Sequence, residues 1–142
     1  MPVKLNTLIE HKREIISIPP DATVFDAIRV MAERAIGALM VIENGKAVGI
    51  LSERDYARKV ILENKSSKET LVKDIMSSPL ITSSPDDSMH TCMALMTEKR
   101  IRHMPVMEGD NLIAILSLGD LVRAVIDEQK NTIQQLETFI TN

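Results

Sequence analysis

The sequence predicts a mixed α+β fold built from two pseudo-symmetric β-α-β-β-α units. A shift of 65 residues, from 17 to 82, aligns residues 17–61 with residues 82–126 without a gap. Apolar residues recur at matching positions of both copies, and turn residues separate runs that have the periods of helices and strands. With 142 residues, of which 44% are hydrophobic and 26% charged, the chain is long enough for two small units that share a core.

The internal repeat is visible as identical residues at equivalent positions. The apolar character also persists where identity fails, as in Ile28 and Met93. The identical pairs are Pro20-Asp21 with Pro85-Asp86, Met31 with Met96, Ile36 with Ile101, Val41 with Val106, Ile50-Leu51-Ser52 with Ile115-Leu116-Ser117, Asp55 with Asp120, and Arg58 with Arg123.

In the first copy, a Pro-Asp turn separates an extended segment from an amphipathic helix. Asn44-Gly45 tolerates positive φ at both residues and therefore marks a hairpin between two β-runs. A second helix opens at Ser52. The expected elements are an extended segment at Ile15–Ile18, a helix containing Val24, Ile28 and Met31, strands at Leu39–Ile42 and Ala47–Leu51, and the helix from Ser52.

The second copy repeats this order, with Gly109-Asp110 at its hairpin and a helix that opens at Ser117. Its extended segments are expected at Leu80–Thr82, Met104–Met107 and Leu112–Leu116. A linking helix is expected at Thr70–Met76, and Leu5–Ile9 is expected to play the same part for copy one. The predicted domains are 1–66 and 67–142, and because each is too small to bury much surface alone, we expect them to pack sheet to sheet.

The C-terminal segment carries apolar residues at alternating four- and three-residue steps through Gln129. This stripe either packs on its own module, which is the ordinary interpretation, or forms a contact between two copies of the chain. Its apolar members are Val122, Ile126, Ile133, Leu136 and Ile140.

Composition excludes several classes of function. The net charge of −3 and the absence of long Lys/Arg runs argue against nucleic-acid binding, and 2% aromatic residues leave no stacking platform for bases. No stretch approaches the roughly 20 apolar residues of a membrane span, and the start of the chain does not resemble a secretory signal, so we expect a cytoplasmic protein. The single Cys92 is expected to be a buried, inert thiol.

The strongest local feature is a Ser-x-x-Asp pattern at each strand-to-helix junction, Ser52 with Asp55 and Ser117 with Asp120. Free N–H groups at such a junction favour anions, and a carboxylate in the first turn can accept from both hydroxyls of a ribose. The same pattern is also a capping box, in which the two side chains only satisfy the amides of their own helix.

These junctions, the gapless repeat, the Pro-Asp turns and the run Arg102-His103-Met104-Pro105-Val106 together resemble a CBS domain pair, also called a Bateman module. In that family the pair binds AMP, ADP, ATP, NAD(H) or S-adenosylmethionine in clefts between the two domains. The resemblance implies that Asp55 and Asp120 bind ribose, with Ser52 and Ser117 beside them. It also implies nucleoside contacts from Ile16, Ser17, Ile18, Ile81, Thr82, Ser83, Met104 and Pro105.

The two copies differ where a phosphate would lie. Arg102-His103 of copy two aligns with Gly37-Ala38 of copy one, whereas Arg54 of copy one aligns with Gly119. Arg102, His103 and Arg54 are therefore candidate phosphate ligands. Arg58 and Arg123 follow their aspartates by three residues, so each either pairs with its aspartate or binds phosphate. Copy two is expected to be the better-equipped site.

No nucleophile with a base, paired carboxylates or metal-ligand spacing stands out, so no enzymatic activity, catalytic cofactor or metal site is predicted. Three hypotheses remain: a sensor of an adenosyl ligand that regulates an unknown partner in trans, a structural or dimerisation module without a physiological ligand, and an enzyme of unrecognised type. We favour the first. The resemblance also implies a homodimer.

Overall fold

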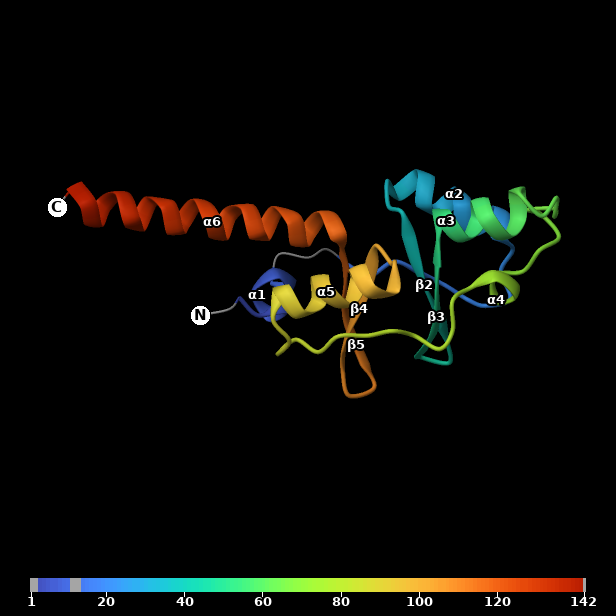
Figure 1. The fold of residues 1–142 in the computed structure, drawn as a ribbon. Coiled ribbons are helices and arrows are strands. Elements are labelled where there is room, and N and C mark those ends of the chain that lie inside the picture. Colours follow the sequence, from blue (N-terminus) through green and yellow to red (C-terminus); the bar gives the residue numbers. More distant parts are fainter. Residues whose placement is uncertain (1–2, 11–13, 142) are drawn as a thin grey trace. The chain divides into compact units, whose positions relative to one another are not determined.

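The computed structural model describes residues 3–10 and 14–141 and divides the chain into two compact units. The first-copy unit is Glu14–Ile81, and the second-copy unit joins the described N-terminal residues to the chain from Thr82 onward. Each unit combines a small sheet with helices, as Figure 1 shows. The mixed α+β class is confirmed, whereas the sheet-to-sheet packing of the copies stays a prediction.

The first-copy unit contains a three-stranded sheet in the order β1-β2-β3. Strand β1 runs parallel to β2, and β3 pairs antiparallel with β2. The hairpin turn is confirmed, because Asn44 and Gly45 have φ values of 53° and 78°. Its elements are β1 (Ser17–Ile18), α2 (Val24–Arg34), β2 (Ala38–Glu43), β3 (Lys46–Ser52), α3 (Glu53–Tyr56), the π-helix η1 (Ala57–Ile61) and α4 (Val72–Ile75).

The second-copy unit repeats the hairpin in the same register. His103 pairs with Ser117 as Ala38 pairs with Ser52, and the strand irregularity at Val106/Met107 matches the one at Val41/Ile42. Its elements are α1 (Leu5–Ile9), α5 (Met89–Lys99), β4 (His103–Glu108), β5 (Asn111–Ser117) and α6 (Leu118–Thr141).

The expected extended segment Leu80–Thr82 does not form a strand. In its place, Ser83 makes a single parallel bridge to Val106, so the sheet of this unit has the two strands β4 and β5.

Helices α2 and α5 begin and end in the same way. The Thr23 hydroxyl accepts from the Asp26 amide at 3.2 Å, and Ser88 caps α5 by accepting from the Thr91 amide at 3.0 Å. Both helices end at a residue in the left-handed conformation, Ala35 and its counterpart Arg100, with φ of 54° and 56°. The apolar face of each helix packs on its sheet, and in the first copy the packed residues are Val24, Ala27 and Met31.

Each linking helix bonds to the copy that does not directly follow it in the sequence. Helix α1 bonds to the second copy, where the Leu5 amide donates to the Asp87 carbonyl at 2.9 Å. Helix α4 bonds to the first copy through the equivalent contact, from the Val72 amide to the Ala22 carbonyl at 2.9 Å. The expectation that Leu5–Ile9 serves copy one is therefore wrong, and the compact units do not follow the boundaries 1–66 and 67–142.

The helices that follow the two hairpins differ in length. Helix α3 has 4 residues, continues as the π-helix η1, and gives way to a turn in which Asn64 has φ of 56°. Helix α6 instead runs without interruption for 24 residues. Within residues 3–10 and 14–141, no helix is both long and apolar enough to cross a membrane.

Candidate ligand-binding sites

The junction of the first copy is a reciprocal capping box between Ser52 and Asp55. The Asp55 Oδ2 atom accepts from the Ser52 amide at 2.9 Å and from the Ser52 hydroxyl at 3.1 Å. In return, the Ser52 hydroxyl accepts from the Asp55 amide at 3.2 Å. The capping interpretation is thus correct for this junction, and it leaves the second oxygen of the carboxylate directed elsewhere.

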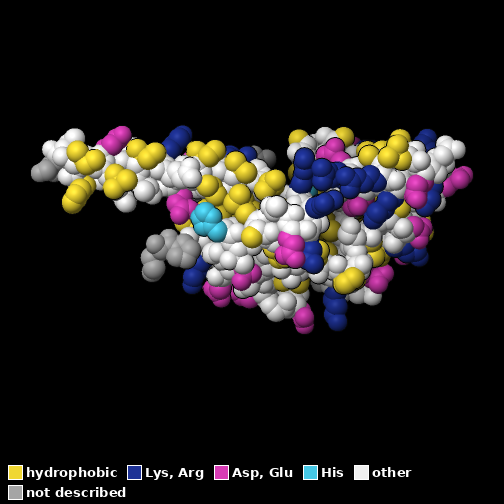
Figure 2. All heavy atoms as spheres, in the orientation of Figure 1, with side chains coloured by type: hydrophobic (Ala, Val, Ile, Leu, Met, Phe, Trp, Pro, Cys, Tyr) yellow, Lys and Arg dark blue, Asp and Glu magenta, His cyan; other side chains and the backbone are white. Residues whose placement is uncertain are grey.

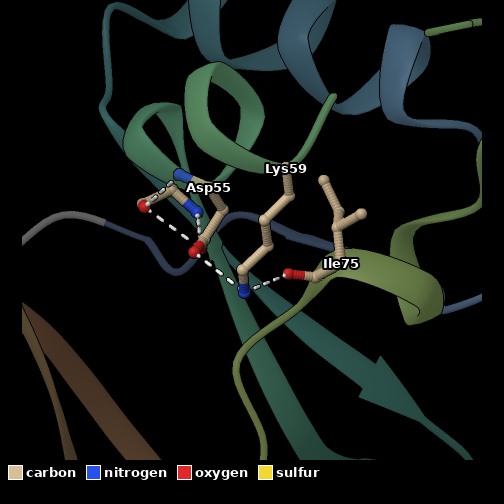
Figure 3. A network of polar contacts seen from close by, with 4 residues as sticks. Asp55, Lys59 and Ile75 are labelled. Carbon is tan, nitrogen blue, oxygen red and sulfur yellow. Dashed lines mark hydrogen bonds and ion pairs between the residues drawn. The ribbon is translucent and has the colours of Figure 1, made fainter. Parts of the chain in front are cut away.

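That second oxygen contacts Lys59 (Figure 3). The Lys59 ammonium lies 3.3 Å from Asp55 Oδ1 and donates to the backbone carbonyl of Ile75 at 2.9 Å. The Asp55 side chain is only 16% exposed, so this ion pair is partly shielded from water. The ion pair expected from Arg58 is formed instead by Lys59, one residue later along the helix, and Arg58 is exposed.

The junction of the second copy repeats the capping box. The Ser117 amide donates to Asp120 Oδ2 at 2.8 Å, and the Asp120 amide donates to the Ser117 hydroxyl at 3.1 Å. Here the arginine three residues on does form the intrahelical ion pair, with Arg123 Nη2 2.7 Å from Asp120 Oδ1. The two aspartates thus take part in equivalent capping boxes but form ion pairs with different residues.

A surface hollow of about 460 Å³ adjoins the second junction. It brings together four of the predicted residues with apolar side chains from the first turns of α6. The Leu118 amide donates to the Arg102 carbonyl at 2.8 Å, which fixes the start of α6 against the start of β4. The lining residues are Arg102, His103, Ser117, Leu118, Gly119, Val122 and Arg123.

At the start of α6, packing does not require residue 119 to be a glycine. A Cβ added there would lie 3.5 Å from Arg123 Nη1 and 3.6 Å from Ser117 Oγ, which are ordinary contact distances. Gly49 differs, because its added Cβ would lie 2.5 Å from the sulfur of Met76. The first-copy glycine therefore allows the segment after α4 to approach β3, a role that its place in the motif did not reveal.

The predicted nucleoside residues divide into exposed and buried groups. Ser17 and Thr82 are exposed, and Ile16 and Ile81 are half-buried. The other four are buried, so their side chains present little surface to a ligand. The buried members are Ile18, Ser83, Met104 and Pro105.

Arg54 is exposed on helix α3, in the first-copy unit. The hollow of the second copy therefore gathers Arg102, His103 and Arg123 but not Arg54 or Arg58. Sequence reasoning missed Lys59, although its four-residue spacing from Asp55 is a signal for a helical ion pair.

Cys92 is buried in α5, as the sequence predicted. Burial raises the pKa of its thiol, the Ser83 hydroxyl bond lowers it, and the nearby Asp87 carboxylate raises it further. Among the described residues, no group of three or more His, Cys, Asp or Glu side chains is arranged to hold a metal ion.

Comparison with known proteins agrees with this architecture. The CBS domain family model matches residues 9–62 and 72–127. The mitochondrial CBS domain-containing protein CBSX3 of Arabidopsis thaliana is 43% identical over 125 residues, which cover 84% of this chain and 61% of that protein. This chain thus spans about three fifths of the length of that relative.

Solved structures show the same likeness. A CBS-domain protein from Burkholderia ambifaria MC40-6 is 44% identical, with a TM-score of 0.86 over 89% of this chain and 96% of that one. The CBS domain pair of protein MJ0100, solved with 5′-methylthioadenosine and S-adenosyl-L-methionine, has a TM-score of 0.80 at 20% identity and covers 90% of this chain and 99% of that one. Because the family model matches both copies of the repeat, the chain belongs to the CBS domain family and carries two CBS domains.

Proposed function

We propose that this protein binds an adenosyl ligand and thereby regulates a partner in trans. The observation that carries the proposal is the hollow of the second copy, where Arg102, His103, Ser117 and Arg123 meet at the start of a long helix. Cationic and hydroxyl groups beside an apolar floor suit a ligand that has both a charged end and a flat, weakly polar base.

The chemistry of the hollow favours a nucleotide over a simple anion. Asp120 adjoins the hollow and is suited to accept from ribose hydroxyls, which an inorganic anion lacks. Arg102 presents a planar fork that suits a phosphate, and the positive end of the α6 dipole favours negative charge. Leu118 and Val122 supply the apolar surface that adenine needs in a chain without Trp.

In the first copy we propose a weaker site at Ser52 and Asp55, with Arg54 and Arg58 as phosphate ligands. Both arginines are exposed, and α3 is too short to give a strong helix dipole. The solved CBS pair with 5′-methylthioadenosine and S-adenosyl-L-methionine supports an adenosyl ligand. The candidates remain AMP, ADP, ATP, NAD(H) and S-adenosylmethionine, and no catalytic cofactor is proposed.

Titration calorimetry with AMP, ATP, NADH and S-adenosylmethionine tests the proposal. We expect at least one to bind more tightly than millimolar, without turnover, and Arg102→Met to weaken the phosphate-bearing ligands about tenfold or more, as expected for a lost charge-assisted bond. Lys99→Met, an exposed change on α5, is the matched control. If none of the four binds, the protein is a structural or dimerisation module instead.

We also propose that the chain forms a homodimer through the apolar stripe of α6. The stripe does not pack on its own unit: Ile133, Leu136 and Ile140 are 54%, 56% and 78% exposed. Figure 2 shows hydrophobic side chains along this helix. The heptad spacing, with Ile126, Ile133 and Ile140 at one core position and Leu136 at the other, is the pattern of a two-stranded coiled coil.

Light scattering tests the dimer. We expect twice the chain mass of 15.8 kDa for the wild type and the single mass for Leu136→Lys. Gln134→Lys adds the same charge two residues away, outside the stripe, and should remain a dimer. A wild type with the mass of one chain would refute this interface. We retain the cytoplasmic location as a proposal, which cell fractionation tests, although the Arabidopsis relative is named as mitochondrial.

A further inference from the structure

The Lys59 ammonium joins two parts of the first-copy unit that are far apart in sequence. It lies 3.3 Å from Asp55 Oδ1 and donates to the Ile75 carbonyl at 2.9 Å. Figure 3 shows the lysine side chain extending from η1 to lie between the carboxylate and the last residue of α4. One ammonium thus contacts the proposed ribose ligand and the linking helix at the same time.

This contact limits the number of further hydrogen bonds that the Asp55 carboxylate can accept. An ionised carboxylate offers roughly four acceptor positions. Three are in use, because Oδ2 accepts from the Ser52 amide and hydroxyl, and Oδ1 accepts from Lys59. A ribose presents two hydroxyls, so both can bond to Asp55 only if one of these donors leaves. The Ser52 amide is fixed by the capping box, and the Ser52 hydroxyl is held near Asp55 because it also accepts from the Asp55 amide. Lys59, at the end of a flexible side chain, is therefore the donor that can leave.

The carbonyl held by Lys59 belongs to the segment that leads to the second copy. Two residues after Ile75, the Ser77 amide donates to the Ile50 carbonyl at 2.8 Å, and the Ile50 amide donates to the Ser77 carbonyl at 3.2 Å. Met76 packs against Gly49 where a side chain would not fit. The segment is therefore held against β3, the strand that ends at Ser52, and Lys59 contributes a further polar attachment.

We propose that Lys59 is a positioning residue that lowers the affinity of the first copy for a ribose diol and couples that affinity to the docking of the linker. A diol that binds Asp55 displaces Lys59, which then releases the Ile75 carbonyl. By reciprocity, release of the linker favours the ligand. The inference rests on the proposed function of Asp55. Copy two has Ala124 at the equivalent position, so this amine is not repeated there.

The test uses adenosine, because it carries the diol without a phosphate that Lys59 would attract. In an Asp120→Ala background, which isolates the first copy, NMR titration should show Lys59→Met binding adenosine about three- to tenfold more tightly than the parent. With 2′-deoxyadenosine, which cannot present both hydroxyls, the gain should disappear. Lys65→Met, which removes an exposed ammonium 3.4 Å from Glu63, is the matched control and should change nothing.

A second measurement needs no ligand. Hydrogen exchange of the Ser77 amide should be several-fold faster in Lys59→Met than in the parent or in Lys65→Met, and Lys59→Arg should restore slow exchange. Adenosine binding that is insensitive to Lys59→Met, or unchanged exchange at Ser77, would overturn the inference while leaving the proposed function intact. Failure of every variant to bind adenosine, together with failure of the nucleotide panel, would overturn the proposed function itself.

Discussion

The two units share the backbone arrangement of the hairpin and of the junction that follows it, but their aspartates contact different cations. Strand register, strand irregularity, helix caps and the capping box all recur at the same shift. Asp55, however, pairs with a lysine that also contacts the linking helix, whereas Asp120 pairs with an arginine of its own helix beside a hollow. The repeat thus preserves what each unit needs to fold, while the cations beside the aspartates have diverged.

The largest expected effect is a loss of stability from core substitutions, which tests whether the two hairpins contribute equally to the stability of the fold. Leu51 and Leu116 occupy the same place in the two hairpins, and both are completely buried. Replacing either with Ala should lower the free energy of unfolding by about 2–5 kcal/mol, because a cavity remains. Urea denaturation would measure both variants. A cost above 2 kcal/mol in one unit and near zero in the other would break the equivalence.

The second prediction concerns the ligand that binds most tightly in the nucleotide panel. Asp120→Ala should weaken it about tenfold or more, because a hydrogen bond to a charged group contributes about 1.5–3 kcal/mol. Asp55→Ala should weaken it less than about threefold, because the hollow gathers Arg102, His103 and Arg123 beside the second junction, whereas Arg54 and Arg58 of the first copy are exposed. Calorimetry on both variants would decide. Equal losses would mean that the two sites contribute alike.

A smaller effect on the free energy of unfolding is expected when the serines that cap the helices after the two hairpins are replaced. Ser52→Ala and Ser117→Ala each remove a side-chain bond to the first turn of a helix and should cost about 1 kcal/mol in the absence of ligand. Thr138→Ala, on the exposed end of α6, is the control. Thermal unfolding would compare the three. A loss that appears only with ligand present would show that the serines bind ligand and do not stabilise the helices.

Much of the fold could be predicted from the sequence because its signals are local. The Asn44-Gly45 turn, the Ser-x-x-Asp caps and the helical spacing of apolar residues each act within a few positions of the chain, and the repeat supplied each signal twice. The hairpin strands and the two junctions therefore lie where they were expected, whereas Leu80–Thr82 does not form a strand.

The exchange of the linking helices could not be predicted in this way. It depends on backbone bonds such as the one from Leu5 to Asp87, between segments far apart in sequence. The lysine contact has the same character, because the Ile75 carbonyl lies 16 residues from Lys59 and carries no side-chain signal. The apolar part of the hollow was not predicted, because Val122 was assigned to the apolar stripe of the C-terminal segment and Leu118 was not singled out.

The last prediction compares Cys92 with Ala27, its equivalent in the first copy; both are buried. Burial raises the pKa of the thiol above its ordinary value of 9.0, so between that value and the folded-state pKa the folded protein holds a proton that the unfolded chain has lost. The thiol therefore contributes stability below about pH 9 that is lost as the pH rises. Urea midpoints of the wild type and Cys92→Ala at pH 7 and pH 10 should show the wild type losing more on going to pH 10. The difference between the two proteins cancels the titration of tyrosine and lysine, so a pH-independent gap would mean that the thiol ionises as easily in the folded protein as in the unfolded chain.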